Sequence, residues 1–205
     1  MTIDHENPAW PYLAFAEQLN ADIAKHAKIK ALFVSNTGIP QATKVKDPMQ
    51  LAKQLMDASE TIMQRLESTL SATRVVAAFG NAEHPSNEAL IRQIADDMIT
   101  KIYAELITWA NMCLGFQVSE QFVPMFKALA NLMSRPIRQF EDFAADVTQR
   151  ANTIDADIRA GRTPSVNFSL SITPTIDDQD MRMYRESVDF AQQYKAPRRG
   201  LFRRG

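Results

Sequence analysis

The residue types that carry most metal chemistry are sparse in this 205-residue chain, and they do not fall at ligand spacing. Its three histidines, His5, His26 and His84, have no second histidine or cysteine near enough in sequence to complete a zinc site. Di-metal helical proteins use Glu-x-x-His pairs, and a histidine three residues on is missing after Glu105, Glu120 and Glu141. We therefore expect no metal and no cofactor.

Candidate catalytic groups are equally isolated. Cys113, the one cysteine, lies in an apolar stretch without a neighbouring histidine, which favours a buried, inert thiol over a nucleophile. The acidic run 177–180 could bind a divalent cation, but acids are also favoured at the start of a helix, and we interpret it that way. No glycine-rich phosphate loop is present. We expect a non-catalytic protein, with an enzyme whose site lies inside the helices as the least favoured alternative.

A cationic C-terminal tail is the first feature with a functional interpretation. The last 11 residues carry five cations and no acid, and since the whole chain has a net charge of −1, residues 1–194 carry −6. Arginine beside apolar residues suits anionic lipid, nucleic acid or an acidic groove on a protein. The alternatives are a solubilising end or an end folded back on the acidic body. The residues predicted to bind such a partner are Lys195, Arg198, Arg199, Leu201, Phe202, Arg203 and Arg204.

An isolated strand is the second such feature. Residues 163–175 alternate strictly between apolar and polar side chains between Pro164 and Pro174, a period that predicts an extended strand. The sequence offers no convincing second strand to satisfy its backbone. It could pair with a partner or a second copy, or lie in a groove between the chain's own helices. The residues predicted for self-association are Val166, Phe168, Leu170 and Ile172.

Long helices must position these segments. Between Phe122 and Ile158, apolar residues recur in steps of three and four, a near-heptad stripe that only an α-helix places on one face. Pro136 lies within the stripe, and because the phase continues across it we expect a kink, with a restart capped by Ser134 as the alternative. Three further helices are predicted over about 11–34, 48–79 and 87–114.

These patterns predict a mostly α fold. We expect an elongated bundle of about four long helices in residues 1–161, followed by an arm, residues 162–205, with a strand, a short helix and the basic tail. Hydrophobic residues make up 45% of the chain and charged residues 23%, which is enough for a substantial core.

The function that we expect is that of a scaffold or adaptor. It would act through protein–protein contacts and would form homo-oligomers. The alternative is a peripheral protein that docks on an anionic membrane or on nucleic acid through its tail. The sequence shows no run of about 18 apolar residues and no secretory signal, so we expect no transmembrane segment and a cytoplasmic location, with peripheral membrane attachment as the alternative.

Overall fold

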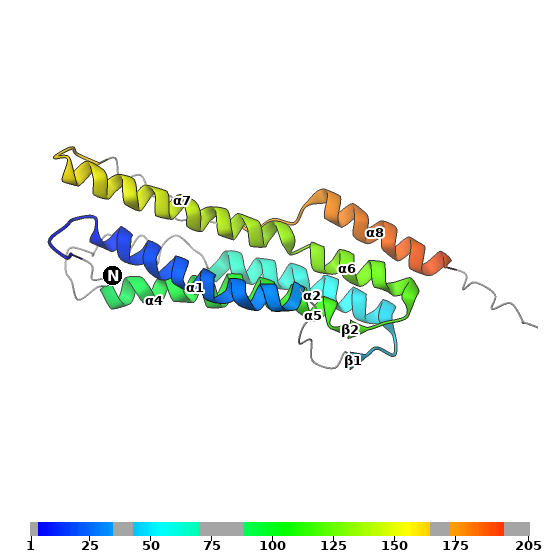
Figure 1. The fold of residues 1–205 in the computed structure, drawn as a ribbon. Helices are drawn as coiled ribbons and strands as arrows, with labels where there is room; N and C mark the ends of the chain where they lie inside the picture. The colour runs from blue at the N-terminus through cyan, green and yellow to red at the C-terminus, as the bar shows by residue number, and fades with distance from the viewer. Residues whose placement is uncertain (1–3, 35–42, 70–87, 165–172, 195–205) are drawn as a thin grey trace, which may run out of the picture.

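The computed structural model describes residues 4–34, 43–69, 88–164 and 173–194, and most of them are helical (Figure 1). The prediction of a mostly α fold is confirmed. In chain order, the elements are α1 (Trp10–Val34), β1 (Thr43–Lys44), α2 (Pro48–Thr69), α4 (Glu88–Met98), the π-helix η2 (Ile99–Tyr103), α5 (Ala104–Leu114), β2 (Phe116–Gln117), the 3-10 helix η3 (Glu120–Phe122), α6 (Val123–Asn131), α7 (Ser134–Arg159) and α8 (Asp178–Gln193). The strands β1 and β2 form a short parallel pair in which Thr43 lies opposite Phe116.

Side-chain caps begin two of the helices, as the sequence indicates. At the start of α2, Asp47 Oδ1 accepts a hydrogen bond from the backbone N–H of Gln50 at 3.0 Å, and Pro48 occupies the first helical position. At the start of α8, Asp177 Oδ1 accepts from the backbone N–H of Gln179 at 2.7 Å. The acidic run 177–180 therefore begins a helix.

A glycine in the left-handed region ends α7. Gly161 has a φ of 70°, and its N–H donates to the carbonyl of Ile158 at 2.9 Å. The N–H of Arg162 donates to the carbonyl of Asp157, also at 2.9 Å. This pair of bonds is a Schellman motif, which satisfies two of the carbonyls left open at a helix end.

The third predicted helix forms as one continuous rod, α4–η2–α5, whose middle segment is the π-helix η2. Backbone angles stay helical at both junctions, at Met98 and at Ala104. The sequence predicts this rod but not the π-helix within it. Residues on more than one of its faces are buried, as expected for a central helix: Ile91, Ala95, Met98, Ile99, Ile102, Tyr103, Leu106, Ile107, Trp109 and Cys113.

The prediction of a kink at Pro136 is wrong, because α6 ends and a new helix, α7, begins at Ser134. In a continuous helix the Pro136 ring would collide with the carbonyl of Leu132 and could not donate to it. As the third residue of α7, Pro136 occupies a position whose N–H has no intrahelical partner, so its missing donor costs nothing. Ser134 is not the cap either; Met133 holds that position without a side-chain bond.

The apolar stripe of α6 and α7 is buried as predicted. The buried members are Phe126, Leu129, Met133, Ile137, Phe140, Ala144, Val147, Ala151 and Ile154. Two members of the stripe, Met133 and Phe140, are predicted to face the second and third helices. In the structure α6 contacts α2 and α5, whereas α7 packs chiefly along α1 and also contacts α5.

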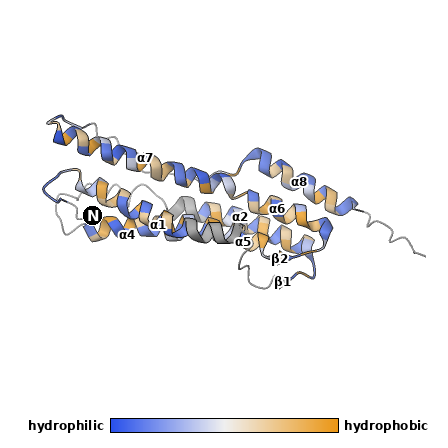
Figure 2. Ribbon diagram, in the orientation of Figure 1, coloured by the Kyte–Doolittle hydropathy of each residue, from blue (hydrophilic) through white to orange (hydrophobic). Residues whose placement is uncertain are grey.

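The remaining packing places α8 on α6, and α6 also contacts α2 and α5 (Figure 1). In Figure 2, polar and apolar residues alternate along α7 and α8, as expected for helices that bury one face. None of the described helices is long and apolar enough to span a membrane.

Candidate functional site

The residues predicted from sequence for self-association, 166–172, and for partner binding, 195–204, lie outside the described residues. The described residues on either side of the predicted strand are both attached to α7. Arg162 Nη2 donates to Asp157 Oδ1 at 2.6 Å, and the backbone N–H of Thr175 donates to Gln139 Oε1 at 2.9 Å. The structure therefore fixes the two ends of this segment but does not test its pairing.

A groove between α2 and α8 is the strongest candidate site in the described structure. Its volume is about 700 Å³. We call it the methionine groove, and its lining consists of Asp47, Met49, Gln50, Ala52, Lys53, Met56, Asp57, Met125, Tyr184, Arg185, Val188 and Asp189. The apolar part contains three methionines, one from the buried face of α6 and two from α2. Methionine side chains are flexible and polarizable, so such a surface can adapt to an apolar side chain of a partner.

Helical spacing explains how the groove is built. On α2, Met49, Lys53 and Met56 recur in steps of four and three and so share one face. On α8, Tyr184 and Val188 do the same. Because α6 contacts both α2 and α8, these two helices flank it and leave the groove between them.

Contacts at the first turn of α8 hold the groove's outer wall. Arg135 Nη1 lies 3.1 Å from Asp177 Oδ2, and Ser134 Oγ donates to Asp180 Oδ2 at 3.3 Å. Further along α8, the Tyr184 hydroxyl lies 3.5 Å from the carbonyl oxygen of Ala52 on α2. These contacts attach α8 to α7 and α2, so the groove is part of the packed structure.

The rim of the groove carries both signs of charge. Lys53 and Asp57 lie one turn apart on α2, and Arg185 and Asp189 lie one turn apart on α8. Among the described residues, none of these four makes an ion pair. Burial, with smaller contributions from Asp57 and Cys113, raises the pKa of Tyr184. The groove therefore offers a neutral phenol and unpaired charges of both signs around an apolar floor.

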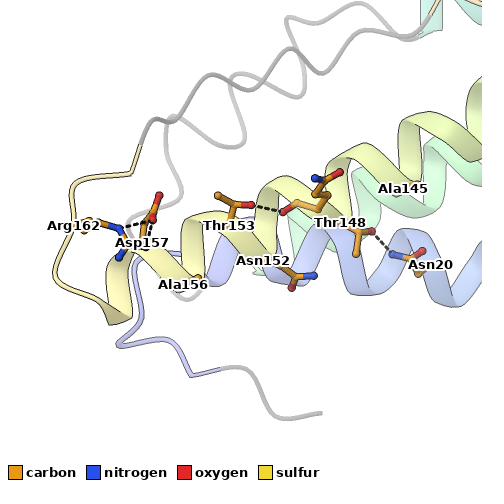
Figure 3. A pocket seen from close by; sticks show the side chains of 9 residues that line it. Asn20, Ala145, Thr148, Asn152, Thr153, Ala156, Asp157 and Arg162 are labelled. Atoms are coloured by element: carbon orange, nitrogen blue, oxygen red, sulfur yellow. Dashed lines mark hydrogen bonds and ion pairs between the residues drawn. The ribbon is translucent and has the colours of Figure 1, made fainter.

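A second hollow lies between α1 and α7 and is lined mainly by amides and hydroxyls (Figure 3). Its volume is about 710 Å³. Several of its polar groups already bond to each other: Asn20 Nδ2 donates to Thr148 Oγ1 at 2.7 Å, and Asp157 pairs with Arg162. The first of these bonds connects α1 to α7, and the second lies at the C-terminal end of α7. We assign this hollow a structural role.

A part-buried hydrogen bond joins Tyr103, the last residue of the π-helix η2, to Glu141 on α7. The Tyr103 hydroxyl donates to Glu141 Oε1 at 2.7 Å, and the Tyr103 ring lies 5.4 Å from that of Phe140 and 6.4 Å from that of His26. Burial and the Glu141 carboxylate raise the pKa of Tyr103, so the phenol stays protonated and does not act as a base near neutral pH. The pair is therefore best explained as a contact between the central rod and α7.

Cys113 is fully buried, as predicted. Burial raises the pKa of its thiol to about 12, so the nucleophilic thiolate is scarce at neutral pH. Across the described ranges, no group of three or more histidine, cysteine, aspartate or glutamate side chains is arranged to hold a metal ion.

The sequence reasoning missed the methionine groove. Met56, Tyr184 and Val188 follow the apolar periodicity of their helices, and these residues pack in part against the core. A signal was present, because α2 carries charged residues at positions 53 and 57, next to its methionines. Pairing of α2 with α8 across α6 could not be read from either helix alone.

Comparison with family models, curated proteins and solved structures finds no match to this chain.

Proposed function

We propose that this protein is a non-catalytic helical scaffold or adaptor that acts through protein–protein contacts, including contacts between copies of itself. The observation that carries the proposal is the methionine groove, an apolar surface with a charged rim between two helices. Grooves of this kind bind amphipathic polypeptide segments by burying a few apolar side chains and pairing charges around them.

Two buried titratable groups, Tyr103 and Cys113, also favour binding over catalysis. Tyr103 is held neutral, Cys113 is held as a thiol, and the carboxylate of Glu141 accepts a hydrogen bond from a phenol. A general base needs a pKa near the working pH and access to substrate, and neither buried group supplies both.

A second candidate function rests on the tail. Its five cations and its Leu201–Phe202 pair suit an anionic membrane surface or nucleic acid. In this account the helical body would carry the protein contacts while the tail holds the protein at the anionic surface. A cytoplasmic location, with peripheral membrane attachment, belongs to this proposal.

Affinity purification of the full-length protein from its native host tests the scaffold function. We compare it with the Met56→Glu variant, which places a charge in the groove, and with Leu90→Glu, which changes a side chain on α4 that is already 47% exposed. We expect a polypeptide that the parent and Leu90→Glu retain and that Met56→Glu does not retain. After purification, this polypeptide should bind the purified parent protein when the two are mixed. Failure of every retained polypeptide to bind in the purified mixture would contradict the proposal.

A further inference from the structure

We propose that the outer face of α8, together with the cationic tail that follows it, binds an anionic lipid bilayer. The inference rests on the second candidate function, in which the tail attaches to an anionic surface, and it names lipid as that surface. It also enlarges the attachment site, because it adds side chains of a packed helix to the last 11 residues of the chain.

Two large apolar side chains lie on the solvent side of α8 (Figure 1). Met183 is 43% exposed and Phe190 is 48% exposed, and because they are seven residues apart they share one stripe of the helix. Neither lines the methionine groove. Tyr184 and Val188, which do line it, lie on the other side of α8 and pack in part against the core. The packing of α8 on the body therefore leaves both exposed side chains accessible to a partner.

An aromatic pair connects this stripe to the tail. The Phe190 ring lies 5.6 Å from the ring of Tyr194, and Tyr194 directly precedes Lys195, the first cation of the tail. Aromatic side chains suit the boundary between bilayer and water, and a tyrosine can bury its ring there while its hydroxyl stays hydrated. The exposed apolar side chains of α8 and the cations of the tail are thus neighbours in the chain.

This combination favours a bilayer over duplex DNA. A single weak hydrophobic anchor gives only marginal attachment to a membrane, and stable attachment takes a second signal such as a cluster of cations. A bilayer can use both features, because hydrocarbon buries the apolar side chains and anionic headgroups attract the tail. Binding to duplex DNA rests mainly on the cations and gives the exposed stripe of α8 no role.

Glu186 supplies a test that loss of folding cannot imitate. It is exposed and lies between Met183 and Phe190 on the same face of α8, so in the docked molecule its carboxylate would lie near anionic headgroups and weaken binding. Glu186→Lys should therefore strengthen attachment. Asp96→Lys makes the same change of charge at an exposed position on α4, which lies at the other end of the molecule from the last turn of α8 (Figure 1).

Co-sedimentation of the full-length protein with vesicles of phosphatidylserine and phosphatidylcholine in equal parts tests the inference. Phe190→Ser and Met183→Ser should each raise the lipid concentration at half-saturation about tenfold, because an apolar side chain is no longer buried in hydrocarbon. Glu186→Lys should lower that concentration about fivefold. The two controls on α4, Asp96→Lys and Leu90→Ser, should stay within about twofold of the parent.

The inference is overturned if these vesicles do not retain the full-length protein, whether or not duplex DNA does. It is also overturned if Phe190→Ser, Met183→Ser and Glu186→Lys all bind vesicles as the parent does. In that case the tail alone makes the attachment and the second candidate function stands. Met56→Glu, in the methionine groove, should bind vesicles like the parent, so that loss of polypeptide binding and loss of membrane attachment are separate results.

Discussion

Two residues close together on α7, Phe140 and Arg138, differ sharply in burial. Phe140 is fully buried, with its ring 5.4 Å from that of Tyr103 and 6.1 Å from that of Phe143, whereas Arg138 is exposed. Phe140→Ala should therefore lower the free energy of unfolding by about 3–5 kcal/mol through lost contacts and the cavity left behind. Arg138→Ala should cost less than about 0.5 kcal/mol. Urea denaturation measures both, and equal losses would show that α7 buries a different face.

Tyr103 should make stability fall at alkaline pH. Its pKa is raised above the ordinary value of 10.0 by burial and by Glu141, so above pH 10 the unfolded chain releases this proton while the folded chain keeps it. The free energy of unfolding then decreases as pH rises. Tyr103→Phe should flatten this decrease, because it removes the group that titrates. Denaturation at pH 8 and above pH 10 gives the comparison, and parallel curves for the parent and Tyr103→Phe would refute the assignment.

Periodicity predicted which residues are buried far better than it predicted where binding occurs. Steps of three and four along 122–158 identified Phe126, Phe140 and Val147 as core, because a helix places such residues on one face whatever surrounds it. Met56 and Val188 follow the same periodicity, but they also line a groove. Whether an apolar residue contacts a neighbouring side chain or lines a groove depends on how helices distant in sequence pack. The sequence of α2 or of α8 alone does not determine that packing.

Among the elements, α7 ends at a glycine that is required for its backbone conformation and not for lack of space around it. Gly161 has a φ of 70°, and a Cβ added there would meet nothing within 4 Å. Gly161→Ala should still lower the free energy of unfolding by about 1–2 kcal/mol, because an L side chain is strained in the left-handed region.

Gly115 at the end of α5 is the matched control for this prediction. Its φ is −80°, and an added Cβ would lie 3.5 Å from two backbone oxygens, an ordinary contact. Gly115→Ala should therefore be within about 0.5 kcal/mol of neutral, or slightly stabilising. Thermal unfolding of the two variants compares them, and a greater loss for Gly115→Ala would contradict the explanation.

Most helix starts and ends could be predicted, but interruptions could not. Asp47 with Pro48, Asp177 and Gly161 act through local chemistry, so the sequence alone places them. The π-helix η2 contains no proline or glycine that would predict an interruption of the α-helix. At Pro136, a kink and a restart both keep the apolar phase approximately, and the choice depends on how α6 packs on α8 while α7 packs on α1.

At the scale of the whole molecule, charge is divided unevenly between the body and the tail. Residues 1–194 carry −6 and the last 11 residues carry +5. Binding through the tail should weaken steeply with salt, because the Debye length falls from about 10 Å at 0.1 M to about 3 Å at 1 M. On duplex DNA, five cations set a limit of about −4.5 for the slope of log affinity against log salt.

Two surfaces and one variant test this prediction. The full-length protein should bind anionic vesicles or duplex DNA at low salt better than a chain ending at residue 194. Phe202→Ala should weaken vesicle binding much more than DNA binding, because the hydrocarbon of the bilayer buries the ring, whereas binding to duplex DNA rests mainly on the cations. Equal retention of the full-length and shortened chains on both surfaces would remove the tail as an anion-binding element.

Site-specific photo-crosslinking in the native host tests most directly whether the methionine groove binds a polypeptide. Lys53, an exposed residue of the groove, is replaced by benzoylphenylalanine, and Arg138, exposed on α7 and outside both hollows, is replaced in the same way as a control. We predict a discrete protein adduct from position 53 and none from position 138. If the partner is a second copy of the chain, the mass of the adduct is twice 23.1 kDa. Absence of any adduct from position 53, or equal adducts from both positions, would contradict the claim.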